Sequence, residues 1–304
     1  MITYNGSDLI LAPLAGFSDV GMRSLCFRYG AGLCFTEMVS AKGLHYNNEN
    51  TQELLHIGKD EPYTGVQLFG SDPDIIAEAI ASERLKNFPV IDINGGCPVP
   101  KVVKNGEGSA LIEKPELIRE IFIKATKAAG GRPVTFKTRK GVTDEELSLD
   151  AALAAQEGGA SMVTVHGRTR KAMYSGYADL DYIAKIKSAL SIPVCGNGDV
   201  TDRESYLRMK QTGVDYVMIA RGAIGRPYVF AAVKGETPDY KVRELIKEHI
   251  GYLSFMADRV VANNMKKQIA FYLKGIPGQK SIKEKVFSAT SLEELLFFVD
   301  SIQF

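Results

Sequence analysis

The sequence predicts a (β/α)8 TIM barrel over residues 1–235, followed by a small helical domain over residues 240–304. Three observations support this fold class. Eight short apolar runs recur through the first three-quarters of the chain, segments of helical character lie between them, and polar or glycine-rich residues follow each run. Beyond the segment 234–239, which is predicted as a linker, helical patterns dominate and strand signals are rare.

The apolar runs are four or five residues long, which is typical of buried strands in a parallel sheet. They occupy residues 9–12, 33–36, 64–68, 90–93, 134–137, 162–165, 192–195 and 216–219. Helical spacing is clearest in the segments 72–80, 115–122 and 180–186. In the first of these, Ser71 or Asp72 supplies a cap and Pro73 begins the helix.

Alternating strands and helices also occur in doubly wound sheets, so the residues after each strand decide between the two folds. A doubly wound sheet gathers functional residues at the switch point in strand order, whereas a barrel gathers them at the carboxyl end of every strand. Every predicted strand here leads into polar or special residues, which favours the barrel. In chain order they are Pro13 to Gly16, Glu37 with Met38, Gln67, Asn94 with Cys97, Lys137 with Arg139, His166 with Arg168, Gly196 to Asp199 and Ala220 to Ala223.

Composition limits the class of protein but indicates no particular partner. Charged residues make up 24% and hydrophobic residues 45% of the 304, with 37 basic residues against 36 acidic ones. We find no secretory signal at the N-terminus and no stretch of the ~18 apolar residues that a membrane span needs. The four cysteines form no C-x-x-C pair, which disfavours a zinc ribbon or an iron–sulfur cluster. We expect a cytoplasmic protein without membrane contact and without a metal.

Residues 94–98 read Asn-Gly-Gly-Cys-Pro and directly follow the fourth predicted strand. Two consecutive glycines give the backbone unusual freedom, and Pro98 then restricts it again. A cysteine that only fills the core does not need such neighbours. We therefore expect the Cys97 thiol to be displayed at the mouth of the sheet rather than buried.

The last two strands lead into segments that suit a phosphate. Residues 196–199 read Gly-Asn-Gly-Asp and residues 220–223 read Ala-Arg-Gly-Ala, and the corresponding loops of many barrels bind phosphate. Each segment alone fits a simple tight turn, but together they favour a bound phosphate. No G-x-G-x-x-G follows the first strand and no P-loop motif occurs, which disfavours dinucleotide-binding domains and P-loop enzymes.

Three further side chains lie near the ends of predicted strands, those of Lys137 and His166 on neighbouring ones. Lys137 ends an apolar strand, where its charge is costly to bury without an anionic partner. His166 is the best placed of the four histidines, and Gln67 can both donate and accept hydrogen bonds at the edge of a heterocycle. With the phosphate segments they predict a site for a phosphorylated heterocyclic cofactor, and flavin mononucleotide (FMN) fits that description.

These motifs resemble those of the bacterial tRNA-dihydrouridine synthases, most closely the B-type branch. The matching segments extend over nearly the whole chain, at residues 12–16, 67–70, 92–98, 137–141, 166–170, 196–199, 220–227 and 272–278. The chain departs from the common pattern at Gly95, Thr138, Leu180 and Ala220. Gly95 replaces a bulky apolar residue, so we expect a looser loop around Cys97.

The resemblance implies an enzyme that uses FMN and NADPH to reduce particular uridines in tRNA. It implies that the flavin is bound by Pro13, Leu14, Ala15, Gln67, Lys137, His166, Asn197, Gly198, Asp199, Ala220 and Arg221. It also implies that Cys97 donates a proton, with Asn94 and Arg139 near the target uracil. A hydride from flavin N5 to uracil C6 requires a proton at C5, and a thiol with a pKa of ~8.5 keeps its proton at neutral pH. No Cys–His pair is evident in the sequence, which favours an acid over a nucleophile.

The helical segment 259–285 carries seven basic residues and one acid, Glu284. A solvated helix face would explain such a run, but beside a uridine-reducing site, contact with the phosphates of tRNA is the better interpretation. The predicted contacts are Lys266, Lys267 and Lys274. The predicted core of this domain consists of Tyr252, Phe255, Phe271, Tyr272 and Phe287.

Two other functions fit part of the pattern. An FMN barrel acting on a free pyrimidine, such as a dihydroorotate or dihydropyrimidine dehydrogenase, would share the phosphate segments but would not need the basic helices. A tRNA-binding protein without catalysis would need the lysines but not the thiol. We expect a monomeric tRNA-dihydrouridine synthase.

Overall fold

The computed structural model describes residues 4–143 and 146–302. Within them, eight parallel strands pair in chain order and the last pairs with the first, which closes a barrel. The predicted (β/α)8 barrel is therefore confirmed. The strands are β1 (Leu9–Leu11), β2 (Leu33–Ser40), β3 (Thr64–Phe69), β4 (Ile91–Gly95), β5 (Val134–Arg139), β6 (Met162–His166), β7 (Val194–Asn197) and β8 (Tyr216–Ile219).

Several strands extend further toward their carboxyl ends than the apolar runs predicted. β4, β5 and β6 include polar residues that were expected to follow them, among them Asn94, Arg139 and His166. β2 continues to Ser40 through a register shift, so the prediction that this strand ends before Glu37 was wrong. The polar residues remain in regular strands because backbone pairing to at least one neighbouring strand continues past the apolar run.

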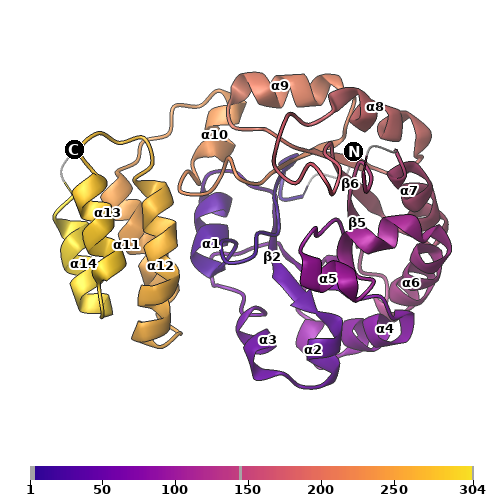
Figure 1. Cartoon of the computed structure of the whole chain (residues 1–304), viewed down its shortest axis with the longest axis horizontal. Coiled ribbons are helices and arrows are strands. Elements are labelled where there is room, and N and C mark those ends of the chain that lie inside the picture. Colours follow the sequence, from indigo (N-terminus) through magenta and orange to yellow (C-terminus); the bar gives the residue numbers. More distant parts are fainter. Residues whose placement is uncertain (1–3, 144–145, 303–304) are drawn as a thin grey trace.

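Helices cover the outside of the barrel (Figure 1), and those predicted at 72–80, 115–122 and 180–186 are present. Asp72 caps the first of them, because its carboxylate accepts from the N–H groups of Asp74 and Ile75 at 3.0 and 3.1 Å. Among the described residues, no helix combines the length and apolar character that a membrane crossing needs. The barrel helices are α1 (Val20–Arg28), α2 (Ala41–His45), α3 (Glu49–Glu53), α4 (Pro73–Ala81), α5 (Pro100–Lys104), α6 (Pro115–Ala128), α7 (Ser148–Glu157), α8 (Leu180–Ala189), α9 (Arg203–Gln211) and α10 (Val229–Lys234), with 3-10 turns at Glu83–Leu85 and Gly108–Glu113.

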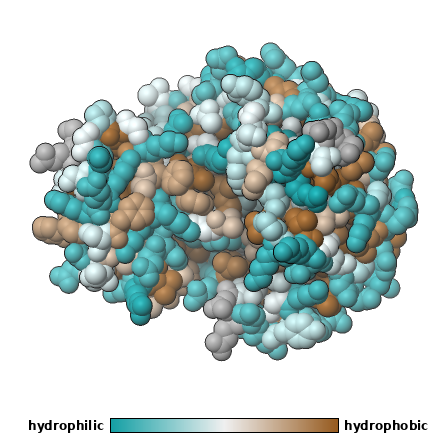
Figure 2. Space-filling view, viewed as in Figure 1, coloured by the Kyte–Doolittle hydropathy of each residue, from teal (hydrophilic) through white to brown (hydrophobic). Residues whose placement is uncertain are grey.

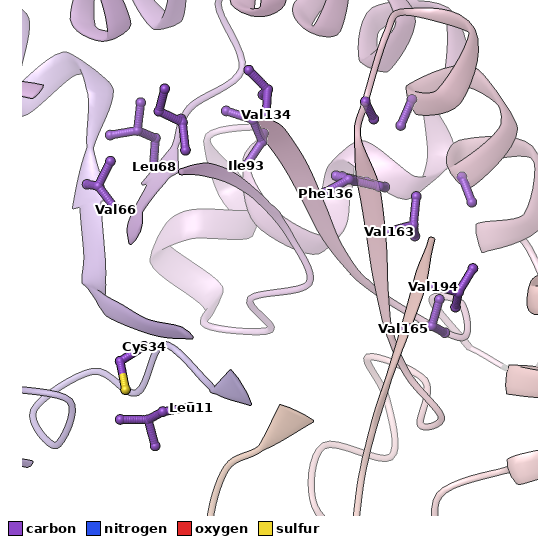
Figure 3. Packing of buried hydrophobic residues seen from close by; sticks show 14 of the residues in the cluster. Leu11, Cys34, Val66, Leu68, Ile93, Val134, Phe136, Val163, Val165 and Val194 are labelled. Carbon is purple, nitrogen blue, oxygen red and sulfur yellow. The ribbon is translucent and has the colours of Figure 1, made fainter. Parts of the chain in front are cut away.

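Alternate residues of each strand face opposite sides, and this period of two separates two layers of the core. Outward-facing residues such as Leu68, Ile93 and Phe136 pack with the surrounding helices, and Figure 3 shows part of this layer. Inward-facing residues such as Phe35 and Met218 belong to a separate cluster inside the barrel. Toward the carboxyl ends the inward positions become polar, so the alternation directs the candidate functional residues into one interior.

Four further helices lie together beside α1 and α10 (Figure 1). They are α11 (Val242–Tyr252), α12 (Asp258–Tyr272), α13 (Lys280–Ser288) and α14 (Leu292–Asp300). Aliphatic residues from all four form a second core, which also includes Val20 and Leu25 of α1. Arg28 of α1 also forms an ion pair with Glu248 of α11. This helical segment is therefore packed directly against the barrel.

A buried polar group joins the two parts. His249 of α11 is fully buried between Asp19, which its Nε2 contacts at 2.7 Å, and the Tyr272 hydroxyl, which lies 3.0 Å from its Nδ1. Asp19 also caps α1 by accepting from the N–H of Met22 at 2.9 Å. Although burial acts to raise the pKa of Asp19, the His249 contact and the Met22 hydrogen bond hold it below its ordinary value. The beginning of α1 is thus tied to two helices of the helical segment.

The predicted aromatic core of the helical segment was largely wrong. Tyr272 is buried, but Phe255, Phe271 and Phe287 are 42%, 37% and 54% exposed. Aliphatic residues such as Leu245 and the other members of the second core fill the space between the short helices. Tyr272 is the one of these five rings that belongs to that core, and the three phenylalanines lie at the surface.

We predict that Gly225→Ala destabilises the protein by about 2–5 kcal/mol. Gly225 has a φ of +68°, and a β-carbon there would overlap the main chain of Phe271 and Tyr272 at the end of α12. Left-handed backbone costs a non-glycine residue about 1–2 kcal/mol, and overpacking adds about 1–3 kcal/mol. Urea unfolding measures the change.

Gly130→Ala is the matched control, because Gly130 has a φ of +60° and open space around it. It carries the backbone strain without the overlap, so we expect a loss of only about 1–2 kcal/mol. Equal losses for both variants would contradict the close contact between α12 and the loop after β8.

Candidate active site

The inward-facing polar residues are neighbours in the strand register. Asn94 pairs with Lys137, Arg139 with His166, and His166 with Asn197. Side chains predicted from separate motifs therefore come together across four adjacent strands. β4 to β7 form one continuous arc of this polar interior.

A chain of hydrogen bonds controls the loop that carries the cysteine. The N–H groups of Gly96 and Cys97 donate to Asn94 Oδ1 at 3.1 and 2.9 Å. Asn94 Nδ2 donates to Gln67 Oε1 at 2.8 Å, and Gln67 Nε2 donates to Asp92 Oδ2 at 2.6 Å. Backbone donors at one end and a carboxylate at the other leave each amide a single orientation.

Asp92 is a site residue that the sequence predictions missed. It is fully buried, and its carboxylate also accepts from the hydroxyl of Thr135 at 2.5 Å. Burial raises the pKa of Asp92 to about 7, against the opposing effects of hydrogen bonds from Gln67 and Thr135 and of the Lys137 charge. The one available signal was an acid in the middle of the apolar run 90–93, since a buried carboxyl needs partners.

Lys137 is the counterpart of Asp92 in the barrel interior. Burial and the nearby charge of Arg139 lower the pKa of Lys137 to about 8, although the Asp92 carboxylate acts in the opposite direction. Burial makes the charge of Asp92 costly and that of the half-buried Lys137 less favourable, and each of the two charges stabilises the other. Lys137 therefore keeps its proton near neutral pH partly because Asp92 is present.

Cys97 is more enclosed than predicted. It is 9% exposed, so the expectation of a displayed thiol was wrong. The loop folds back because the Cys97 carbonyl accepts from the N–H and the hydroxyl of Ser109 at 3.1 and 2.9 Å. Burial raises the pKa of the thiol, although the N–H of Val99 and the charges of Arg139 and Lys137 oppose the rise. The thiol is thus protonated at neutral pH.

Gly95 has a packing role that explains its small size. A β-carbon at this position would overlap the ring of Phe136, which packs edge-on against Phe122 at a centroid distance of 5.6 Å. The ring of Phe136 therefore occupies the space of the absent side chain. The structure gives no sign of the looser loop that we expected, since Asn94 and Ser109 both hold the loop in place.

Arg139 connects the cysteine loop with the loop that follows β6. Its Nε donates to the Gly96 carbonyl at 2.8 Å, and its Nη1 donates to the carbonyls of Thr169 and Met173 at 3.1 and 3.0 Å. Burial lowers the pKa of Arg139, and its guanidinium lies 6.0 Å from the ring centre of Tyr174. These three hydrogen bonds go to backbone carbonyls of the two loops. They hold the Arg139 guanidinium, a cation, close to Cys97.

His166 and Arg168 each carry a buried nitrogen, Nδ1 and Nη1 respectively, that has no hydrogen-bond partner in the described part of the chain. Burial and the charges of Lys137, Arg139, Arg168 and Arg221 lower the pKa of His166 to about 2, so its imidazole is neutral. Arg168 was not among the predicted cofactor residues. Its other nitrogens bind Ser175, Gly176 and Asp199, and Asp199 also pairs with Arg221 at 3.2 Å.

A cavity of about 920 Å³ opens beside this polar interior. Figure 2 shows apolar residues gathered between the helical segment, at the left, and the barrel. Nine predicted site residues line the cavity: Leu14, Ala15, His166, Asn197, Gly198, Asp199, Ala220, Arg221 and Lys274. Eight others lie outside its lining: Pro13, Gln67, Asn94, Cys97, Lys137, Arg139, Lys266 and Lys267. Its volume is near the upper end of the range of about 300–1,000 Å³ for small-molecule sites.

The three predicted tRNA-contacting lysines differ in their surroundings. Lys274 is exposed and lines the cavity. Lys266 is half-buried on α12. Lys267 is also half-buried, and its ammonium lies 5.1 Å from the ring centre of Phe17, in the loop after β1. The lysines therefore do not form one uniform basic face.

A sequence profile described as dihydrouridine synthase (Dus) matches residues 10–303. The chain belongs to the dihydrouridine synthase family. Over 288 residues it is 38% identical to tRNA-dihydrouridine synthase B of Pseudomonas aeruginosa, which covers 90% of this chain and 86% of that protein. Over 300 residues it is 35% identical to the probable tRNA-dihydrouridine synthase 1 of Synechocystis sp., covering 95% and 84% respectively. The resemblance predicted from the motifs is confirmed.

Solved structures agree with the barrel of this dihydrouridine synthase family member. Morphinone reductase superposes with a TM-score of 0.56 at 11% identity, over 77% of this chain and 87% of that one. The structure of morphinone reductase in complex with tetrahydroNAD gives a TM-score of 0.53 at 12% identity, over 77% and 88%. At this identity the likeness shows a shared fold.

We predict that Asn94→Ala increases the rate of Cys97 alkylation by iodoacetamide about fivefold or more in the folded protein. The change leaves two loop N–H groups without their acceptor, and one hydrogen bond is worth about 1 kcal/mol. The assay reports on Cys97 because Cys26, Cys34 and Cys195 are 0% exposed. Mass spectrometry of the modified peptide measures the rate.

Thr135→Val is the control for this measurement. It removes the hydrogen bond to the other oxygen of Asp92 and leaves the bonds between Gln67, Asn94 and the loop intact. We expect its alkylation rate to stay within about twofold of the wild type. If both variants reacted equally fast, the hydrogen-bond chain would not be what holds the loop.

Proposed function

We propose that this protein reduces the C5–C6 double bond of uridines in tRNA, with FMN as its cofactor and NADPH as its reductant. Membership of the dihydrouridine synthase family and similarity to curated tRNA-dihydrouridine synthases support the reaction. The structural observation that carries the proposal is a nearly buried thiol, whose pKa burial raises, in a loop that Asn94 and Arg139 hold at the edge of a cation-rich interior.

The residues present fit an anionic flavin. The unpartnered His166 Nδ1 and Arg168 Nη1 require polar partners, and buried polar groups rarely lack them. The cations of the interior favour a phosphate or another anionic group. We propose that FMN is held by Arg168 together with Pro13, Leu14, Ala15, Gln67, Lys137, His166, Asn197, Gly198, Asp199, Ala220 and Arg221. When bound, the reduced flavin supplies the hydride.

In this proposal Cys97 supplies the proton. Its raised pKa keeps the proton on Sγ until the proton is transferred to C5 of the uracil. The thiolate left after transfer lies near Arg139 and Lys137, whose charges act to lower the pKa of Cys97 and so stabilise that form. Asn94 contributes by holding the N–H groups of the loop, which fixes the position of Sγ relative to the strand.

The target base must leave its stack to reach this interior, which costs a few kcal/mol that other tRNA contacts must offset. We propose that Lys266 and Lys274 supply such contacts by binding phosphates, and Lys274 lines the cavity. Phe271 also lines the cavity and is partly exposed, so its ring can stack on a base. All four cysteines are free, which agrees with our proposal that the protein works in the reducing cytoplasm, and we also propose that it is a monomer.

Cys97→Ala should slow the reduction of tRNA uridine by about 10²–10⁴-fold, the usual contribution of a general acid. The reduction of the bound flavin by NADPH should not change, because no proton is delivered to uracil in that step. Stopped-flow absorbance follows the flavin in both half-reactions. Unchanged single-turnover oxidation by tRNA would rule out Cys97 as the proton donor. Oxidation of the wild-type flavin by free uridine or orotate, but not by tRNA, would instead indicate an enzyme acting on free pyrimidines.

Lys274→Glu should weaken tRNA binding and reduce the slope of log Kd against log salt concentration by about 0.7–0.9, the share of one phosphate contact. Lys127→Glu on α6 makes the same charge change on an exposed residue of a helix that lies away from the helical segment (Figure 1), and should leave the slope unchanged. Filter binding across a salt series measures both. Equal slopes for the two variants would show that Lys274 does not contact a phosphate of the tRNA.

A further inference from the structure

The loop between β1 and α1 carries Pro13, Leu14 and Ala15, which the proposed function assigns to the flavin. This loop is in contact with the helical segment. The last two turns of α12, in the helical segment, lie against it and contribute Lys267, Gln268 and Phe271 to the contact. Phe17 and Phe271 both line the large cavity, so this contact forms part of the cavity wall.

Lys267 contacts this loop through its ammonium group. A β-carbon on Gly16 would overlap its ammonium group, so the charge lies directly against the loop backbone. The same ammonium lies 5.1 Å from the ring centre of Phe17. That ring meets Phe271 edge-on at 5.3 Å, which fixes it between the cation and α12.

Lys267 also acts on the acceptor that holds the loop from the other side. The N–H of Gly16 donates to the carboxylate of Glu37 on β2. Burial raises the pKa of Glu37, while the Gly16 hydrogen bond and the charge of Lys267 oppose the rise. Removing the Lys267 charge would therefore make Glu37 a poorer acceptor for the Gly16 N–H.

Gln268 and the end of α12 extend the contact. Gln268 is fully buried, and its Nε2 donates to the Phe17 carbonyl at 3.1 Å and to Asp19 at 3.2 Å. The main chain of Phe271 abuts Gly225 in the loop after β8, which follows the phosphate segment 220–223. The end of α12 therefore touches two of the loops that the proposed function assigns to the flavin.

We infer that Lys267 is a positioning residue for the flavin-binding loop, instead of the tRNA contact expected from its sequence. It holds residues 13–17 in the conformation that receives FMN, through Phe17, Gly16 and Glu37. The inference rests on the proposed function, since it concerns the same cofactor. It also assigns the helical segment a second role besides binding tRNA, namely completing the wall of the flavin site.

Lys266 provides a matched control on the same helix. It has the same charge and is also half-buried, but it lies about 100° around the helix from Lys267. Its charge interacts with Glu294 of α14 instead of with the barrel loop. Replacing either lysine with alanine makes the same change in net charge, so a difference between the two variants reports on position.

The test compares Lys267→Ala, Lys267→Arg and Lys266→Ala in the full-length protein. After removal of bound flavin, FMN is added back and its Kd is measured by quenching of flavin fluorescence, with the bound absorption spectrum recorded. Thermal melting of each apoprotein confirms that it is folded. We expect Lys267→Ala to weaken FMN about tenfold, which is within the range for a desolvated cation–π contact, and to shift the bound spectrum. Lys267→Arg should restore both to near wild type, and Lys266→Ala should change neither.

Wild-type FMN affinity in a folded Lys267→Ala protein would overturn the inference and leave the proposed function intact. So would equal weakening by Lys266→Ala, or loss of tRNA affinity without loss of FMN affinity in Lys267→Ala. A wild-type protein that binds no FMN would overturn the proposed function and this inference together.

Discussion

The buried carboxylate of Asp92 is the constraint on which the candidate site depends. It accepts hydrogen bonds from Gln67 and Thr135, so it sets the orientation of the Gln67 amide and, through it, that of Asn94. Asn94 then presents its oxygen to the N–H groups of the cysteine loop. Because every group in this series of hydrogen bonds has its partner, the loop is held in place although its glycine-rich sequence is not rigid. The loop after Gly95, which begins with Gly96, is thereby held in one conformation.

The same interior balances charges that would be unstable separately. Arg139, Arg168 and the neutral His166 are buried close together, and the half-buried Lys137 lies beside them. Asp92 and Asp199 compensate part of this positive charge, and the remainder favours an anion. For Cys97, burial outweighs the cations, so the thiol keeps its proton while its conjugate base still has positive neighbours. This combination suits an acid that must release a proton and recover it.

The helical segment is structurally part of the site. Its core includes two residues of α1, its His249 binds the cap of that helix, and α12 contacts the loops after β1 and β8. Aliphatic residues and Tyr272 form its core, while Phe255, Phe271 and Phe287 lie at its surface. The sequence indicated only that this helical segment is basic. In the structure it also forms part of the wall of the 920 Å³ cavity.

The sequence by itself determined the barrel and most of the residues at its carboxyl end. Apolar runs, helix caps and polar strand ends are local patterns, so Asn94, Lys137, His166 and Asn197 could be predicted without knowing what they contact. Only the tertiary structure decided that Asp92 faces Gln67, 25 residues away, that Ser109 encloses Cys97, and that Gln268 binds Phe17 across 251 residues. The local periodicity of the sequence predicts which face of a strand or helix a residue occupies. It does not predict which distant residue will contact that face, because the contact depends on closure of the barrel and on the packing of α12 against the barrel.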